Sequence, residues 1–362
     1  MNARAGRILE RLGNLVDNRA RLEVTMNRFG SQFSVEIFGE SHGQCLGIIV
    51  DGCPAGLPLA EADLKADLER RKPGATGTTR RQERDLPRLR SGVFEGRTTG
   101  APILILFENE DADPAAYKWV QRTPRPGHAD LTSFLKFGGN ADYRGGGHFS
   151  GRLTAGLVAA GAIAKKLLAP LELHSSLLEV GGCRDIEEAV REALAAGDSV
   201  GGLVECRIGP VPAGLGEPFF DSVESVLAHI LFAIPAVRGV EFGAGFASAS
   251  MRGSLCNDPI CDVAGTTSGN NAGGINGGLS NGNEIVLRVA IKPPSSVAVK
   301  QDTVDLCTGK TVALRTKGRH DACIALRVPV VVEAACAIAL ADLASRQQLI
   351  PRIWAKKPLP CD

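Results

Sequence analysis

Two histidines, several arginines and a glycine triplet lie close together within residues 125–157. The segment 125–130 reads RPGHAD, and the segment 142–152 reads DYRGGGHFSGR. Glycines let backbone N–H groups approach a ligand closely, and arginines form paired hydrogen bonds with phosphate or carboxylate groups. Histidine titrates near neutral pH and could move protons beside such a ligand. The cluster therefore predicts an anion site with acid–base chemistry, although each feature alone is also typical of a turn-rich loop.

Two further polar segments precede this cluster. His42 lies in FGESHG at 38–43, between two apolar runs that are typical of strands. We expect it in a turn, where a histidine beside serine and glycine is most often exposed. Residues 76–90 (TGTTRRQERDLPRLR) lack regular periodicity and contain five arginines. Because long irregular loops commonly bind ligands, this segment is predicted to be a mobile loop suited to a polyanion.

Composition limits the classes of function. The 362 residues include 41 basic and 40 acidic side chains, and aromatic residues make up 5%. Near-zero net charge and few aromatic residues argue against a nucleic-acid partner or an acidic membrane surface. Ten cysteines occur without a C-x-x-C pair, which disfavours structural zinc. With no long apolar run and no secretory pattern, we expect a reduced, cytoplasmic protein without a membrane partner.

The apolar spacing predicts strands and helices that mix along one α+β unit. Strands are expected at 32–38, 46–50, 102–107, 203–208 and 284–291, and helices at 59–71, 155–168, 221–232 and 330–345. Because no long repeat or low-complexity linker is found, residues 26–362 are predicted to form a single domain. Residues 1–25 are predicted to be a peripheral extension or the result of a misassigned start, since Met26 precedes a complete first strand.

Three polar features allow a structural interpretation on the residues alone. Asp221, with Glu224 three positions later, is the expected N-cap of the helix at 221–232, and His229 is expected to pack or be exposed. Asp342 adjoins the buried face of the helix at 330–345, where a carboxylate needs a partner, so capping or pairing is favoured. The glycine-rich stretch 266–282 matches neither common nucleotide-binding fingerprint.

Several motifs, taken in order, resemble the chorismate synthase family. They are FGESHG at 38–43, RRKPG at 70–74, RPGHAD at 125–130, RGGG at 144–147, GVEFG at 239–243, NAGG at 271–274 with Gly277 and Gly278, KPPSS at 292–296, and KGRHD at 317–321. The resemblance runs from about Met26 to beyond Asp342. Because so many motifs occur in the family's order, it is far more specific than any single glycine run.

The resemblance implies a flavoprotein enzyme. Members of the family convert 5-enolpyruvylshikimate 3-phosphate to chorismate by an anti-1,4-elimination of phosphate and a C6 hydrogen. They require reduced FMN without net oxidation, and NADPH is a possible reductant. The implied fold is a β-α-β sandwich with helices between antiparallel sheets, and the implied assembly is a homotetramer.

The resemblance also assigns roles to residues of this chain. His42 would protonate the departing phosphate, His128 would protonate reduced flavin near N1, and Asp342 would act with flavin N5 to remove the C6 proton. Arg71 matches a position that binds NADP or a substrate anion. The implied FMN contacts are His148, Phe149, Ser150, Pro235, Ala236, Gly277, Lys292, Pro293, Pro294, Ser295, Ser296 and Arg319.

Three departures from the family pattern change these expectations. Many members have Arg-Ser-Ser where this chain has His148, Phe149 and Ser150, so a histidine or a backbone amide would replace an arginine contact to flavin phosphate. The expected second NADP-linked arginine is missing, with Gly77 nearest, which favours a separate flavin reductase over NADPH. The connection between Leu168 and Val200 is shorter than in the longer members, which should trim a peripheral element.

Two other classes of protein remain open at this point. A glycine-rich, arginine-bearing RNA-binding protein would explain residues 76–90, but the balanced charge and few aromatic residues oppose it. A flavin-binding protein without turnover would retain the glycine loops but would leave the histidines without a role.

Overall fold

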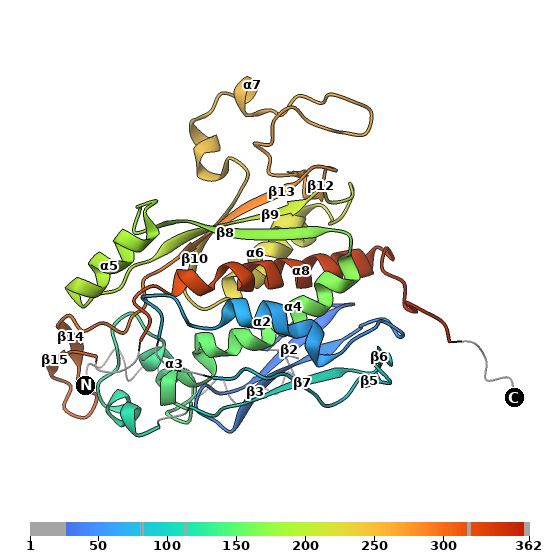
Figure 1. Cartoon of the computed structure of the whole chain (residues 1–362). Helices are drawn as coiled ribbons and strands as arrows, with labels where there is room; N and C mark the ends of the chain where they lie inside the picture. Colours follow the sequence, from blue (N-terminus) through green and yellow to red (C-terminus); the bar gives the residue numbers. More distant parts are fainter. Residues whose placement is uncertain (1–26, 80, 82, 112–113, 317–319, 358–362) are drawn as a thin grey trace, which may run out of the picture.

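The computed structural model describes residues 27–79, 81, 83–111, 114–316 and 320–357 of the chain. Residues 1–25, predicted to be an extension, and Arg319, predicted to contact flavin, lie outside the described residues. The described chain forms three layers, in which helices separate two antiparallel sheets (Figure 1). This architecture confirms the predicted α+β sandwich.

The first sheet has five strands in the order β1-β2-β3-β7-β4. Its strands are β1 (Arg28–Phe29), β2 (Ser34–Gly39), β3 (Cys45–Asp51), β7 (Ile103–Glu108) and β4 (Arg88–Leu89). Alternate side chains of β7, namely Ile103, Ile105 and Phe107, are fully buried on the helix side. Because side chains alternate across a strand, this one apolar face fixes the register of β7 against β3.

The second sheet has four strands in the order β10-β13-β9-β8. They are β10 (Val237–Phe242), β13 (Ile285–Ile291), β9 (Gly202–Gly209) and β8 (Glu172–Val180). Val204, Cys206 and Ile208 of β9 are buried, whereas Glu205 between them pairs with Arg288 Nε at 3.0 Å on the opposite face. The sheet therefore has an apolar face toward the helices and a charged outer face.

Four helices form the middle layer: α2 (Lys65–Arg71), α4 (Thr154–Leu168), α6 (Val223–Ala233) and α8 (Pro329–Arg346) (Figure 1). Every residue of α8 from Val330 to Ala344 is buried, as expected for a helix that is apolar on nearly all sides. Gly161 of α4 lies against Ala334 of α8, where a Cβ atom would be 2.3 Å from the alanine Cβ. The two helices thus pack with almost no side chain between them.

The ends of two helices differ slightly from the predicted ones. Ser222, rather than Asp221, caps α6, because its Oγ accepts a hydrogen bond from Ser225 N at 3.1 Å. The predicted helix at 59–71 is divided into a 3-10 turn, Glu61–Leu64, and α2. Leu64 and Leu68 are nonetheless buried, as predicted from their spacing.

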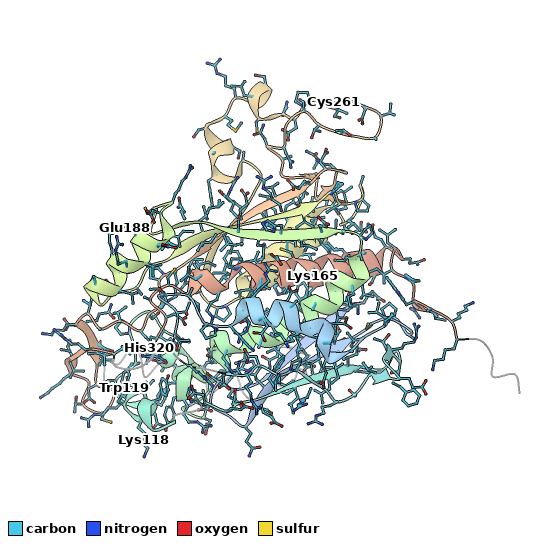
Figure 2. The ribbon with its side chains drawn as sticks, in the orientation of Figure 1. Lys118, Trp119, Lys165, Glu188, Cys261 and His320 are labelled. Atoms are coloured by element: carbon cyan, nitrogen blue, oxygen red, sulfur yellow. The ribbon has the colours of Figure 1, made fainter. Side chains whose placement is uncertain are left out.

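A buried carboxylate connects the middle layer. Glu333 of α8 accepts hydrogen bonds from both Arg70 terminal nitrogens at 2.7 Å, from Lys165 Nζ at 2.8 Å and from Ser175 N at 2.9 Å. Figure 2 shows Lys165 within this layer. Because these bonds satisfy the carboxylate, α2, α4, α8 and β8 are fixed relative to one another.

Shorter elements surround the layers. They are α3 (Asp130–Lys136), α5 (Ile186–Ala196), α7 (Gly253–Cys256), the hairpins β5 (Val93–Phe94) with β6 (Arg97–Thr98), β11 (Ile275–Asn276) with β12 (Leu279–Ser280), and β14 (Gln301–Val304) with β15 (Thr311–Leu314), and the 3-10 turns Pro114–Gln121, Arg144–Phe149, Gly151–Leu153, Phe219–Asp221, Gly245–Ser250 and Ile324–Arg327. The segment with α7 projects beyond the four-stranded sheet, and Cys261 lies on it (Figures 1 and 2).

In the part of the chain that is described, no helix is both long and apolar enough to span a membrane.

Candidate active site

One cavity of ≈ 920 Å³ gathers most of the polar motifs. Its walls come from the start of the chain's described part, the loop after α2, the segments around both histidine motifs, the end of α6, and the KPPSS segment. This volume lies near the upper end of the range for small-molecule sites, so the cavity can hold a ligand of considerable size or two smaller ones. Among the described residues, no cluster of His, Cys, Asp or Glu is arranged to hold a metal ion.

The glycine triplet Gly145 to Gly147 lies between the two histidine motifs. All three residues have positive φ angles, of 57°, 84° and 53°. A Cβ atom at Gly145 would lie 2.3 Å from His42 Cδ2, and one at Gly146 would lie 3.2 Å from His128 Cε1. Gly147 O accepts a hydrogen bond from Ser41 N at 3.1 Å. The triplet is therefore glycine because it must turn in the left-handed region while leaving room for two imidazole rings.

His42 is buried, with 6% of its surface exposed, so the expectation of an exposed turn histidine was wrong. The Tyr117 ring packs against it in a T-shaped arrangement with a centroid distance of 5.0 Å, and Arg81 Nη1 lies 3.4 Å from its Nε2. Burial, and then the charges of Arg81 and Arg144, lower the pKa of His42 to about 4. The ring is therefore neutral at physiological pH, and its buried Nδ1 has no hydrogen-bond partner among the described residues.

His128 is oriented by the other residues of its own motif. Its Nδ1 lies 2.5 Å from Asp130 Oδ1, and Arg125 binds the same carboxylate through Nε and Nη2 at 2.8 Å. Burial disfavours the charge on Asp130, but the bonds from Arg125 and His128 outweigh it and hold the pKa of Asp130 well below its usual range. A carboxylate at Nδ1 fixes the orientation of the ring.

A pair of buried arginines forms another part of the wall. Arg71 Nη2 binds Asp85 Oδ2 at 2.7 Å, and Arg152 Nη1 binds Asp85 Oδ1. Burial lowers the pKa of Arg71 to about 10, although Asp85 partly compensates, so the guanidinium stays charged at neutral pH. Arg71 Nε and Arg152 Nη2 have no hydrogen-bond partner among the described residues. Such buried donors fit an anionic ligand.

The loop at 76–90 contributes fewer arginines than predicted. Arg81 lines the cavity and donates to Ser41 O at 2.8 Å and to Glu83 Oε1 at 2.6 Å. Arg84 pairs instead with Glu110, and Arg88 and Arg90 are exposed outside the cavity. Arg80 lies outside the described residues. The acidic residues of the loop, Glu83 and Asp85, line the cavity as well, which the count of arginines did not indicate.

Asp342 does not line the cavity, so its implied role in proton removal is not supported by its position. Only 3% of it is exposed, and its Oδ1 accepts hydrogen bonds from the backbone N–H groups of Ser31, Gln32 and Phe33 at 2.9, 2.7 and 3.0 Å. This carboxylate instead fixes the chain before β2 to α8. The simpler expectation from the residues alone, that Asp342 caps or pairs, describes its geometry.

Asp321 is a carboxylate of the cavity that the sequence analysis missed. Its Oδ1 accepts from Thr79 N at 2.9 Å and from Arg327 Nη1 at 3.2 Å, and Arg327 Nε donates to Arg71 O at 3.0 Å. Asp321 is the last residue of the KGRHD motif, so its adjacency to Arg319 was the available signal. Tyr117, Arg152, Asp85 and Arg238 are further lining residues without a predicted role.

Most of the residues implied to contact FMN line the same cavity: His148, Phe149, Ser150, Pro235, Ala236, Lys292, Pro294, Ser295 and Ser296. Gly277 and Pro293 do not. Lys292 Nζ bonds Gly127 O at 3.0 Å and Ser295 Oγ at 2.6 Å, while burial and then Arg238 lower the pKa of Lys292. Cationic and hydroxyl groups are thus concentrated at the KPPSS segment.

His148 does not offer a free nitrogen to an anion. Its Nδ1 lies 2.8 Å from Gly39 O, and its Nε2 lies 3.0 Å from Asn27 Oδ1. Both ring nitrogens are therefore used to connect the start of the described chain with the end of β2. The expectation that His148 replaces an arginine contact to flavin phosphate does not fit this geometry.

Comparison with known proteins gives a consistent result. A family model described as chorismate synthase matches residues 33–344. The chain is 56% identical to the chorismate synthase of Chitinophaga pinensis over 91% of this chain and 99% of the relative, and 45% identical to that of Korarchaeum cryptofilum over 87% and 96%. A crystal structure of chorismate synthase matches with a TM-score of 0.68 and 26% identity, over 88% of this chain and 93% of that one. The chain therefore belongs to the chorismate synthase family, and it is a carbon–oxygen lyase.

Proposed function

We propose that the ≈ 920 Å³ cavity is the site at which this member of the chorismate synthase family eliminates phosphate from 5-enolpyruvylshikimate 3-phosphate. The observation that carries the proposal is the position of Gly145 to Gly147 between His42 and His128, at a cavity that the buried cations Arg71 and Arg152 also line. Together these groups supply two proton carriers and an anion-binding wall in one enclosed space.

His42 is proposed to protonate the departing phosphate once that phosphate is bound. In the ligand-free cavity the pKa of His42 is about 4, which leaves the ring neutral and unable to act as an acid at neutral pH. A phosphate that binds beside Arg81 would neutralise this arginine's field and attract a proton onto the imidazole. The charge of the bound substrate thus converts His42 into its protonated, acidic form.

His128 is proposed to hold and transfer a proton at its Nε2, since Asp130 occupies its Nδ1. Asp321 is proposed as the cavity carboxylate that assists removal of the C6 proton. Its Oδ1 accepts a hydrogen bond from Arg327 Nη1 at 3.2 Å, which fixes the position of the carboxylate in the cavity wall. Asp342 has a structural role in this proposal.

Reduced FMN is proposed as the cofactor. His42 Nδ1 and Arg71 Nε have no hydrogen-bond partner among the described residues, and together with the size of the cavity they fit a substrate and a flavin bound together. Lys292, Ser295 and Ser296 would hold the cofactor, with Pro235 and Ala236 forming the adjacent wall. When bound, reduced flavin supplies electron density to the elimination and recovers it, so that no net oxidation occurs.

A separate reductase is proposed to supply the reduced flavin. Gly77, the residue nearest to the missing second arginine, has φ of 91°, and a Cβ atom there would lie 2.4 Å from Val190 Cγ1. Its O accepts a hydrogen bond from Ala322 N at 2.7 Å. Because this backbone is fixed and crowded, an arginine here would be strained, which argues against NADPH as the direct reductant.

A homotetramer in the cytoplasm is proposed as the functional form. Phe219, Phe220 and Phe246 are 84%, 94% and 82% exposed in the single chain. Large exposed aromatic side chains favour contact with another protein surface, and further copies of the same chain are the proposed partners. Light scattering should give a mass of four chains, and a monomeric mass would overturn this part of the proposal.

An anaerobic assay tests the reaction directly. The full-length protein, supplied with FMN reduced in advance by dithionite, should convert 5-enolpyruvylshikimate 3-phosphate to chorismate and inorganic phosphate. His42→Ala should lower turnover by about 10² to 10⁴ while FMN affinity stays near the wild-type value, since general acid catalysis typically contributes that much. FMN binding without phosphate release would instead favour a flavin-binding protein without turnover.

A further inference from the structure

Asp85 is a buried carboxylate in an irregular loop, and it is not one of the proposed proton carriers. Only 5% of it is exposed, and it lines the cavity. Its φ angle is 50°, in the left-handed region that few residues other than glycine, asparagine and aspartate occupy. A residue persists in that region only where its surroundings hold it, which indicates that the position of this side chain is tightly constrained.

The constraint comes from two arginines on different elements. Arg71 is the last residue of α2, and Arg152 lies in the 3-10 turn before α4. One oxygen of Asp85 accepts from Arg71 Nη2 at 2.7 Å, and the other accepts from Arg152 Nη1. Arg71 Nη1 also bonds Thr154 Oγ1 at 3.3 Å, and Arg152 Nε bonds Asn109 Oδ1 at 3.2 Å. Both guanidinium planes are thereby fixed.

Each arginine nevertheless keeps one donor without a hydrogen bond among the described residues. These donors are Arg71 Nε and Arg152 Nη2, and the nearest carboxylate oxygen to the latter, Glu83 Oε2, is 3.7 Å away. Without a carboxylate between them, two buried guanidinium groups would repel each other strongly. With Asp85 in place, the three groups retain one net positive charge and two unsatisfied donors.

We propose that Asp85 is a positioning residue, which holds Arg71 and Arg152 as one anion-binding surface and limits the charge of that surface. This inference rests on the proposed function, because the anion is taken to be the phosphate or carboxylate of the substrate. The carboxylate weakens the attraction for the ground-state anion but aligns the donors for the reaction. Removing its charge should therefore tighten anion binding and slow turnover at the same time.

The first test compares wild-type full-length protein with Asp85→Asn, which keeps the shape of the side chain. Calorimetry with inorganic phosphate, without flavin, gives the Kd, and the anaerobic assay gives kcat and KM. We expect the phosphate Kd to fall about tenfold, because one opposing charge is removed, and KM to fall with it. We expect kcat to fall about 10²-fold, a typical effect of misplaced binding groups.

A merely structural carboxylate would produce a different pattern. It would lower the folded fraction, and hence apparent kcat, but would leave KM and the phosphate Kd of the folded protein unchanged. Asp67→Asn is a matched control, because Asp67 pairs with Arg70 at 3.3 Å and Lys165 at 2.7 Å but does not line the cavity. This variant should lose thermal stability while retaining wild-type kcat, KM and phosphate Kd.

Asp85→Glu provides a second test, which also decides the matter if the Asn variant does not fold. It keeps the charge but displaces it by one methylene, so the phosphate Kd should stay within about threefold of wild type while kcat falls about tenfold. Wild-type kcat in the Glu variant, or unchanged Kd and kcat in the Asn variant, would overturn the inference. A wild-type protein that forms no chorismate would overturn the proposed function instead.

Discussion

Gly145 lies so close to His42 that a Cβ atom on the glycine would be 2.3 Å from Cδ2 and 2.5 Å from Nε2 of the imidazole ring. The two residues are far apart in sequence, yet the absence of one side chain determines where the other can lie. The position of His42 therefore depends on a residue that carries no functional group.

Gly145→Ala should displace the His42 ring and lower turnover by about 10²-fold, because small displacements of reacting groups have effects of that size. The matched control is Gly182→Ala. Gly182 has a similar positive φ angle of 78°, but a Cβ atom there would have no neighbour within 4 Å. Both variants should lose about 1–2 kcal/mol of stability through backbone strain, and only Gly145→Ala should lose activity. Equal turnover in the two would contradict the proposed contact.

The pKa of His42 should depend on whether an anion is bound. In NMR titrations of histidine-labelled protein, the His42 resonance should titrate with a pKa of about 4 without ligand. Inorganic phosphate should raise this pKa, because an anion beside the ring stabilises the imidazolium form. His42→Gln identifies the resonance by removing it. A His42 pKa that does not change in saturating phosphate would argue against the proposal that substrate binding protonates His42.

The same burial makes the stability of the protein depend on pH. The pKa of folded His42 is about 4, below the ordinary value of 6.5, so the unfolded chain takes up a proton in this interval that the folded chain does not. This contribution to stability is fully present above pH 6.5 and is lost as the pH falls toward 4. In thermal unfolding, His42→Gln should therefore show a shallower decrease of Tm between pH 6.5 and 4 than the wild type.

Asp321→Asn and Asp342→Asn should have opposite effects. Asp321 lines the cavity and accepts hydrogen bonds from Thr79 N and Arg327 Nη1, so its replacement should lower kcat by about 10² or more with a smaller loss of Tm than in Asp342→Asn. Asp342 accepts three backbone hydrogen bonds, so its replacement should cost about 2–3 kcal/mol of stability and leave kcat of the folded protein nearly unchanged. Normal turnover in Asp321→Asn, together with inactive but stable Asp342→Asn, would restore the role assigned by resemblance.

The source of electrons can be tested without mutation. The protein should be active with dithionite-reduced FMN or with an added flavin reductase, and almost inactive with NADPH and FMN alone. The crowding of Gly77 by Val190 explains this expectation. Robust aerobic turnover with NADPH, FMN and no added reductase would show that the protein reduces flavin itself.

The layered fold could be predicted because alternating and helical apolar spacing identified the buried strands and helices. The site could be predicted where a motif brings its own partners, as Arg125, His128 and Asp130 do within six positions. The site could not be predicted in those parts where the partner of a residue is distant in sequence. Helical spacing placed Asp342 at a buried edge, but the three N–H groups that it binds lie about three hundred residues earlier.

The burial of polar groups was the second property that could not be predicted from the sequence. A turn between two strands suggested that His42 is exposed, because nothing near it in sequence indicated that Gly145 to Gly147 would cover it. The function of the loop at 76–90 was likewise predicted from its arginines alone, and Asp85 was not predicted to belong to the site. A single carboxylate that pairs with two arginines has no local signature, since both arginines come from other elements.

Because Gly161 contacts Ala334 directly, α4 and α8 pack as closely as possible, and the distance between the two sheets is correspondingly small. The cavity takes its walls from the N-terminal turns of these helices and from strands of both sheets, so its width depends on this remote contact as well as on its own lining. Even a methyl group at position 161 would widen the gap between the sheets and draw the His42 wall away from the KPPSS wall. Mutations at an apolar helix contact outside the cavity could thus change how well two ligands are held against each other.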